Sequence, residues 1–291
     1  MKSINLLLLL IAFCFYTSNG QESLKNYQKI KNTYFIENKG QWHDEVKYYV
    51  KMKGMDAWLT STGIVYDFYI IEDKRPEEIR TKENHDKILK KYEIAPVETF
   101  LKRKGHVVRM EYEGMNKNCR FEPKVKSETY HNYFIGQDSS KWASYVGLYK
   151  EVIVKDVYPG IDVRWYLGDE KLTMKGEKSD ESKPDSQSLI PDDKANPNFR
   201  SGKADEGLRY DFIVHPGADV SQIRMKFEGQ DGLEINSRGE LVIKTSIGNV
   251  FHGNIFCYQE IGDTFEKIEC SFIMNDNLIG FLGSNYTKKK N

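Results

Sequence analysis

The clearest indication of the fold class is the stretch Tyr210-Asp211-Phe212-Ile213-Val214-His215-Pro216-Gly217-Ala218-Asp219-Val220-Ser221-Gln222-Ile223. It begins as an apolar strand pattern and runs directly into a Pro-Gly turn, where proline fixes one φ angle and glycine permits the next. The stretch Tyr158-Pro159-Gly160-Ile161-Asp162 has the same design. Alternating apolar residues flank both turns, which is typical of β-strands. Both stretches predict a β-rich scaffold, and neither indicates a chemical reaction.

Other segments repeat this strand and turn pattern. Trp58–Tyr66 and Leu233–Ile243 each read as a hairpin. The run Val108–Gly114 is echoed by Ile223–Gly229, and alternation in each run places charged residues on one face and apolar residues on the other. The 18 Tyr, 15 Phe and 4 Trp residues favour strands and can fill a sizeable core. We predict an all-β fold of two packed, antiparallel β-sandwich-like lobes.

The predicted lobes comprise residues 21–168 and 208–286. Their sequence echoes suggest related lobes, although the shuffled order of the echoes also fits convergent strand chemistry. Residues 169–207 are charged and nearly lack aromatic residues. Such a segment cannot bury enough apolar surface to offset its ordering entropy, so we predict a long disordered insertion. The charged segment Lys74–Glu93 predicts a short helix or an ordered excursion, and residues 287–291 predict a frayed basic tail.

The N-terminus has the features of a secretory signal peptide. Lys2 precedes an apolar run from Ile4 to Tyr16, and small polar residues follow at Thr17–Gly20. The apolar run is well short of the ~20 residues that a membrane-spanning helix requires. We therefore predict a signal peptide over residues 1–20 and no transmembrane segment after cleavage. An uncleaved membrane anchor is the alternative.

The composition argues against nucleic-acid binding. The 291 residues include 43 Lys and Arg against 43 Asp and Glu, and removal of residues 1–20 would take away only one lysine. Proteins that bind nucleic acid usually present a clearly basic face. We therefore expect no nucleic-acid partner for this exported protein, whether it is periplasmic, bound to the cell surface or secreted.

Four separated motifs carry a family resemblance. They are Phe35-Ile36-Glu37-Asn38-Lys39-Gly40-Gln41-Trp42, Asn132-Tyr133-Phe134-Ile135-Gly136 and the two Pro-Gly stretches described above. In this order they resemble the uncharacterised N-terminal domain of secreted Bacteroidetes proteins, which typically precedes SBBP-type β-propeller repeats, adhesion-like modules and a C-terminal sorting domain. The resemblance covers Phe35 to Tyr286. It implies an exported, mostly β module with no assigned activity, so no catalytic residues are carried over.

Three cysteines lie beyond the predicted cleavage site: Cys119, Cys257 and Cys270. Cys257 and Cys270 flank a predicted turn at Ile261–Phe265, so they would face each other across a hairpin at disulfide distance. An exported protein permits that bond. Buried free thiols are the alternative for this pair, and core packing is the expected role of Cys119.

Motifs for catalysis or metal binding are missing from the sequence. It contains no nucleophile elbow, phosphate-binding loop, paired Cys ligands or His-Glu-x-x-His helix, so we predict no catalytic residues, metal or cofactor. Asp162, Asp211 and Asp219 lie at strand ends or turns. They would either bind Ca²⁺ with loop oxygens or accept hydrogen bonds from turn amides. The lack of a dense Asp/Asn ladder favours the structural role.

Aromatic residues are the other candidates for a binding surface. Eight of them would form a stacking platform for sugars if they stood exposed on one sheet face: Trp42, Tyr48, Tyr49, Trp58, Trp142, Tyr145, Trp165 and Tyr166. Core packing is the competing role for these side chains. The ligand-binding candidates are Trp42, Trp142, Trp165, Asp162 and Asp219.

These observations predict a binding or structural module of the cell envelope or extracellular space, with no catalytic activity and with a glycan or an envelope protein as partner. The alternative is an extracellular hydrolase that acts on glycan or peptide through two carboxylates. A cleft that holds two acidic residues with raised pKa values and no cationic partner would favour the hydrolase. An exposed surface of Trp or Tyr would favour binding.

Overall fold

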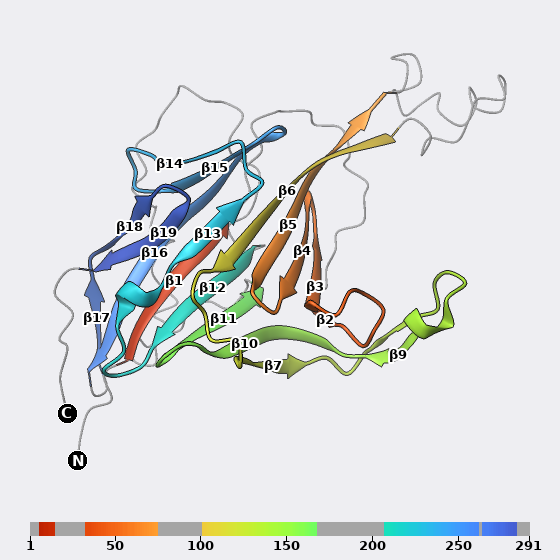
Figure 1. The fold of residues 1–291 in the computed structure, drawn as a ribbon, viewed down its shortest axis with the longest axis horizontal. Coiled ribbons are helices and arrows are strands. Elements are labelled where there is room, and N and C mark those ends of the chain that lie inside the picture. The colour runs from red at the N-terminus through yellow and green to blue at the C-terminus, as the bar shows by residue number, and fades with distance from the viewer. Residues whose placement is uncertain (1–5, 15–32, 75–100, 168–206, 262–263, 284–291) are drawn as a thin grey trace, which may run out of the picture.

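The computed structural model describes residues 6–14, 33–74, 101–167, 207–261 and 264–283 (Figure 1). These residues form nineteen strands and two short 3₁₀ turns. All ladders between the strands are antiparallel. The predicted all-β, antiparallel fold is therefore confirmed.

The strands of the first half of the chain, with the first 3₁₀ turn, are β1 (Leu6–Cys14), β2 (Phe35–Glu37), β3 (Val46–Met52), β4 (Met55–Thr60), β5 (Gly63–Asp73), β6 (Leu101–Tyr112), β7 (Arg120–Lys126), β8 (His131–Tyr133), η2 (Ser139–Lys141), β9 (Ala143–Val146), β10 (Leu148–Tyr158) and β11 (Ile161–Leu167). Those of the second half are β12 (Leu208–Val214), η3 (Val220–Gln222), β13 (Met225–Glu228), β14 (Gly232–Ile235), β15 (Leu241–Thr245), β16 (Gly248–Ile261), β17 (Thr264–Ile268), β18 (Cys270–Asn275) and β19 (Leu278–Gly283). Seventeen strands belong to one sheet, and β8 and β9 form a separate hairpin.

The large sheet curls through both halves of the chain (Figure 1). One succession of paired neighbours runs β18-β19-β13-β6-β5-β4-β3-β2-β10. It continues from β10 as β11-β12-β1-β16-β15-β14. The strand β7 pairs with β10, and β17 pairs with β16. Strands of the two predicted lobes therefore lie next to each other in one sheet.

The two lobes also share one core. The ladders β6–β13 and β11–β12 each join a strand before the predicted insertion to a strand after it. A single cluster of buried apolar side chains includes Tyr66 and Phe68 from the first lobe and Tyr210 and Phe212 from the second. The rings of Tyr112 and Phe212 meet edge to face across the halves, with centroids 5.9 Å apart. The lobes are thus packed into a single folded body.

The echo between Val108–Gly114 and Ile223–Gly229 has a structural counterpart. The first run includes the end of β6 and the second contains β13, and these two strands are direct neighbours in the sheet. Met110 pairs with Phe227 on the buried face, and Glu111 pairs with Lys226 on the other face. Opposite charges directly across a ladder stabilise strand pairing. The two runs are alike because each lies in one strand of an adjacent pair and has one buried apolar face and one charged face.

The two Pro-Gly turns lie against each other. Pro159-Gly160 connects β10 to β11, and Gly160 has the positive φ of 72° that such a turn requires. The backbone N–H of His215 donates to the carbonyl of Gly160 at 2.9 Å. A Cβ at Gly160 would lie 2.9 Å from the Cβ of Ala218, so only glycine allows this approach. The hairpins predicted at Trp58–Tyr66 and Leu233–Ile243 are confirmed as β4–β5 and β14–β15.

Several predictions fall on residues that the structure does not describe. The insertion at 169–207, apart from Gly207, lies outside the described residues, as do the tail at 287–291 and the segment Lys74–Glu93 apart from Lys74. Residues 6–14 of the predicted signal peptide form β1, while removal of residues 1–20 stays a prediction. Within the described ranges, no helix has the length and apolar character needed to cross a bilayer.

Candidate functional site

The candidate binding surface is a projecting segment formed by residues 127–147, which we call the arm. It contains β8, η2 and β9, and Figure 1 shows β9 and the neighbouring loop at the margin of the molecule, beyond β2 and β7. The carboxylate of Asp138 caps η2 by accepting from the backbone N–H of Ser140 at 3.0 Å. The side-chain oxygen of Asn132 accepts from the backbone N–H of Tyr145 at 2.9 Å. Local hydrogen bonds therefore give the arm a defined shape.

Large apolar side chains gather on the arm in contact with solvent. Ile135 is 76% exposed and Tyr145 is 67% exposed. Of the twelve large apolar side chains that are exposed in the described part of the chain, five lie on the arm: Tyr130, Phe134, Ile135, Trp142 and Tyr145. The rings of Tyr130 and Tyr145 lie 4.7 Å apart, and those of Phe134 and Trp142 lie 5.8 Å apart. Exposed apolar side chains that gather on one segment are typical of interaction surfaces.

The base of the arm is anchored by half-buried aromatic rings. Tyr133 of β8 contacts Trp42 edge to face, with ring centroids 5.4 Å apart. Trp42 packs on Tyr49 at 5.2 Å, and Tyr49 packs on Trp58 at 5.5 Å. A small separate core lies beside them and consists of Ile36, Ala143, Val146 and Leu148. The arm is therefore fixed at its base while its outer side chains remain free to contact a partner.

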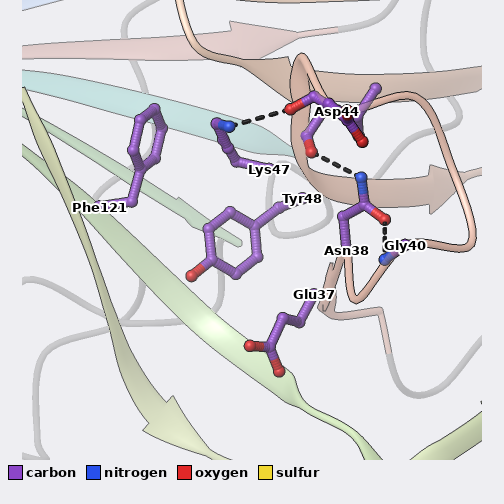
Figure 2. A pocket seen from close by; sticks show the side chains of 8 residues that line it. Glu37, Asn38, Gly40, Asp44, Lys47, Tyr48 and Phe121 are labelled. Atoms are coloured by element: carbon purple, nitrogen blue, oxygen red, sulfur yellow. Dashed lines mark hydrogen bonds between the residues drawn. The ribbon is translucent and has the colours of Figure 1, made fainter. Parts of the chain in front are cut away.

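A shallow recess adjoins the base of the arm (Figure 2). It encloses about 390 Å³ and is lined mainly by the segment from Glu37 to Tyr48, with Phe121 opposite. Asn38 shapes this segment: its amide nitrogen donates to the carbonyl of Val46 at 2.8 Å, and its oxygen accepts from the backbone of Gly40 at 3.0 Å. The neighbouring Lys39 donates its Nζ to the carbonyl of Tyr145 at 2.9 Å. Glu37, which lines the recess, accepts from the backbone N–H of Gly147 at 3.2 Å, so the recess borders the end of the arm.

Backbone strain is present on the same surface. Tyr145 has a φ of 53°, in the left-handed region that bulky residues rarely adopt. Its N–H and its carbonyl are each held by a side chain, Asn132 and Lys39 respectively. Residues held in strained conformations by their surroundings concentrate at functional sites. The strain at Tyr145 is a second observation that points to the arm.

Among the acidic candidates, Asp211 has the most unusual environment. It is fully buried on β12, and burial raises its pKa to about 7, although Arg164 nearby acts against this shift. The Tyr166 hydroxyl donates to Oδ1 at 3.2 Å, and Arg164 lies 3.7 Å from Oδ2. Arg164 itself is paired with Glu151 at 2.6 Å. A carboxyl enclosed in this way has no access to a substrate.

The other acidic candidates are engaged within the fold. Asp162 is buried, and its Oδ2 meets Lys155 at 2.5 Å and His215 at 2.8 Å. Burial opposes its ionisation, yet hydrogen bonds from Lys155, the backbone of Asp156 and His215 hold the pKa of Asp162 below its usual value. Asp219 caps η3 and accepts from the backbone N–H of Ser221 at 3.1 Å. Asp219 thus accepts from a turn amide as expected, whereas Asp162 accepts from two side chains and from the backbone N–H of Asp156 in β10.

The three tryptophan candidates occupy different environments. Trp165 is fully buried and packs on Tyr210 with ring centroids 4.8 Å apart, so the described fold keeps it away from a ligand. Trp42 lies half-buried at the base of the arm. Trp142 is exposed on the arm and donates its ring N–H to the carbonyl of Gly136 at 3.3 Å. Only Trp142 belongs to the candidate binding surface, and Trp42 supports the base of the arm.

Sequence reasoning missed Phe134 and Ile135 as surface residues. They stand in the motif Asn132–Gly136, where two adjacent large apolar residues precede a glycine with a φ of 79°. Adjacent side chains on a strand point to opposite faces, so both can be buried only in a strand that is covered on both sides. The turn at Gly136 directly follows Phe134 and Ile135, so any such strand would be short. This turn was the feature of the sequence from which their exposure could have been predicted.

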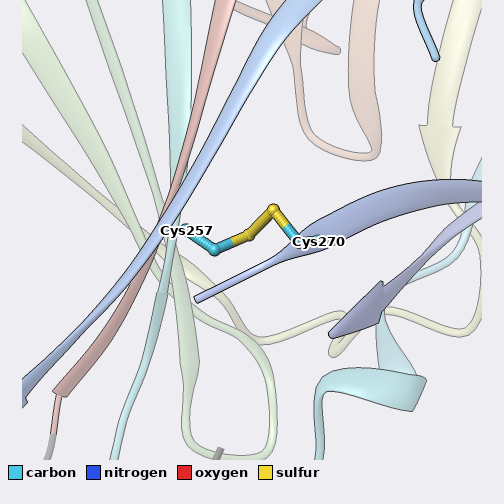
Figure 3. The surroundings of a disulfide bond; sticks show 2 residues. All are labelled: Cys257 and Cys270. Atoms are coloured by element: carbon cyan, nitrogen blue, oxygen red, sulfur yellow. A yellow bond between two sulfur atoms is a disulfide. The ribbon is translucent and has the colours of Figure 1, made fainter. Parts of the chain in front are cut away.

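Cys257 and Cys270 form a disulfide (Figure 3). Their Cα atoms lie 6.1 Å apart. The bond does not cross the β16–β17 hairpin as expected, because the ladder pairs Cys257 with Ile268. Cys270 stands two residues further on, at the first position of β18, and the bond therefore ties β16 to β18. Cys119 is free and half-buried against the core.

Comparisons with known proteins assign no activity. The model of one protein family, described as a domain of unknown function (DUF7948), matches residues 35–186 and 198–291. No curated protein and no solved structure matches the chain. Within the described residues, no three His, Cys, Asp or Glu side chains gather in a group that could hold a metal ion.

Proposed function

We propose that this chain, which belongs to the DUF7948 family of domains of unknown function, is an exported, non-catalytic binding module. It would contact a protein of the envelope or extracellular space through the arm. The observation that carries this proposal is the gathering of five exposed apolar side chains on one anchored projection. Exposed apolar surface of this kind usually marks the site at which a partner binds and covers it.

The composition of the arm favours a protein as the partner. Phe134 and Ile135 have no polar atom in their side chains and offer only apolar area. Protein interfaces are enriched in aromatic residues at their centres, and buried Trp and Tyr residues often dominate the binding energy. Trp142 and Tyr145 would supply these contacts. A glycan is the second candidate, because the same two rings could stack on sugar faces.

The N-terminal sequence and the disulfide support export. Disulfides persist in oxidising compartments outside the cytosol, and Cys257 and Cys270 form such a bond. We therefore propose that residues 1–20 are a cleaved signal peptide and that the mature chain is periplasmic, bound to the cell surface or secreted. The motifs at Phe35–Trp42 and Asn132–Gly136 further favour a role like that of the N-terminal domains that precede SBBP-type repeats and sorting domains in secreted Bacteroidetes proteins.

The hydrolase alternative gains little from the described carboxylates. Asp211 has a raised pKa, but it is fully buried and lies beside Arg164. Asp162 is ionised and paired with Lys155 and His215. A general acid must reach its substrate and a catalytic pair must share a cleft. We therefore propose a function that depends on surface contacts.

A capture experiment tests this proposal. Immobilised exported protein is incubated with an envelope extract and, in parallel, with a glycan array. The arm variant carries Phe134→Ser, Ile135→Ser and Trp142→Ser, and the matched control carries Ile273→Ser and Leu282→Ser, which are exposed on β18 and β19. We expect the arm variant to lose a protein that both the wild type and the control retain. Equal capture by all three proteins would refute the role of the arm, and glycan binding lost only in the arm variant would change the class of partner.

A further inference from the structure

The strand β1 occupies a central place in the sheet (Figure 1). Residues 7–12 pair with β12, and residues 6–14 pair with β16 on the other side. Both ladders are antiparallel, so β12 and β16 run parallel to each other with β1 between them. The edges of β12 and β16 that face β1 thus depend on this one strand for their hydrogen bonds.

The strand lies outside the domain that the family defines. The family match begins at residue 35, whereas β1 ends at Cys14. The matched region therefore contains β12 and β16, the two strands that flank β1 and that we call the walls, but it does not contain β1 itself. The same residues lie within the predicted signal peptide. Cleavage after Gly20 would remove β1 and leave a slot one strand wide.

We propose that the slot between β12 and β16 is a donor-strand site, in which an extended apolar segment of a partner protein replaces β1 after cleavage. The proposal depends on the predicted cleavage and is independent of the arm. The donor would be about as long as β1, which has nine residues, and would run antiparallel to both walls. Addition of a strand to open sheet edges is an established mode of peptide recognition, with backbone hydrogen bonds supplying affinity.

Direct closure of the slot is disfavoured by the topology. If β12 and β16 paired with each other, they would form a parallel ladder in a sheet whose described ladders are all antiparallel. The strand β16 is also held on its far side by β15 and β17, and the disulfide ties Cys257 to β18. The strand β12 is held by β11 along seven residue pairs. Moving the walls together would disturb these ladders.

An open slot is disfavoured as well, because buried backbone groups need partners. The walls are largely apolar where they face the core: Tyr210, Phe212 and Val214 of β12 and Cys257 of β16 are buried there, alongside the buried His252 of β16. The segment Leu6–Cys14 consists entirely of apolar residues, Leu-Leu-Leu-Leu-Leu-Ile-Ala-Phe-Cys. An uninterrupted apolar run is typical of a strand that is covered on both faces. The donor should therefore be apolar at successive positions.

The test uses the exported protein and a synthetic peptide. The full chain is produced in an exporting host, and mass spectrometry identifies the N-terminus of the exported product. The probe is a peptide with the sequence of residues 6–14 and added terminal lysines for solubility. Leu9 pairs with both Phe212 and Cys257. A Leu9→Pro peptide, which lacks a ladder N–H, should bind at least about tenfold more weakly than the unchanged peptide or a Leu9→Val control.

The expected result is saturable binding that slows amide hydrogen exchange at residues 209–214 and 251–260. The arm variant should bind the peptide as the wild type does, so failure of the proposed arm function would not affect this outcome. If the exported protein is unfolded by itself, the peptide should restore its near-UV circular dichroism. The proposal is overturned if the exported protein retains residues 6–14. It is also overturned if both strands are protected without peptide, or if the peptide neither binds nor restores folding.

Discussion

Asp211 combines complete burial with few partners, and this has a consequence for stability. Its Oδ2 accepts no hydrogen bond from the described residues, and burial raises its pKa to about 7. The folded protein therefore retains a proton that the unfolded chain releases above about pH 4. Stability contributed by this proton is present at low pH and is lost as the pH rises from about 4 to about 7.

Replacement of Asp211 by Asn should abolish that loss. The stability of Asp211→Asn relative to the wild type should increase by on the order of 2–4 kcal/mol between pH 4.5 and pH 7.5, as measured by urea unfolding. His252, whose pKa burial lowers to about 3, makes both proteins less stable as the pH falls below about 6.5, so it cancels in this difference. If the free energies of unfolding of the two proteins instead changed equally with pH, Asp211 would be ionised in the folded protein.

Val125 at the end of β7 gives a test of backbone strain. It is a β-branched, exposed residue with a φ of 53°, a region that such side chains disfavour. Val125→Gly should be more stable than Val125→Ala by about 1 kcal/mol, because glycine relieves the steric clash that any Cβ causes. Thermal unfolding of the two variants measures this difference. Greater stability of the alanine variant would mean that the strain is absent.

Single residues were also where prediction from sequence was weakest. Trp165 and Trp142 are the same residue type on strand-like segments, yet one is fully buried and the other is exposed. Asp162 was a ligand candidate, but its partners are Lys155 within β10 and His215 directly after β12. Exposure and ion pairing depend on which segments cover a side chain, and the sequence alone does not contain that information.

At the scale of elements, the disulfide makes a direct prediction. The bond closes a loop with a sequence separation of 13 residues and joins β16 to β18. Loss of such a crosslink increases the entropy of the unfolded chain, so the double variant Cys257→Ala and Cys270→Ala should lose about 2–4 kcal/mol of stability in urea. Cys119→Ala is the matched control, because that thiol is free. Equal stability of the double variant and the wild type under oxidising conditions would contradict this assignment.

Elements with strong local signals were predicted well. The hairpins β4–β5 and β14–β15 were found because alternating residues flank a turn that contains glycine. The bond between Cys257 and Cys270 was expected across a hairpin, whereas Cys270 actually begins the next strand, β18. The arm was not predicted, because its exposed side chains have the same composition as a buried strand. Local patterns thus define turns better than they define which face is covered.

At the scale of the whole molecule, the sequence predicted the fold class but not the order of the strands. Alternation and aromatic content indicated antiparallel sheets, and one curled sheet with a shared core is observed. The echo of Val108–Gly114 in Ile223–Gly229 was interpreted as a sign of related lobes or of convergent strand chemistry, and the structure shows that these runs pair directly. Pairing between distant strands depends on long-range packing, which leaves only weak traces in a single sequence.

We propose that the arm is the surface through which this protein contacts a protein partner. The most direct test places a photo-crosslinking amino acid at Ile135 on the arm or, as a matched control, at the similarly exposed Leu282 on β19, in cells that export the protein. We predict a discrete crosslinked partner from position 135 that disappears when Trp142→Ser is added, and none from position 282. Crosslinks that are equal at the two positions, or that persist with Trp142→Ser, would show that the arm does not form this contact.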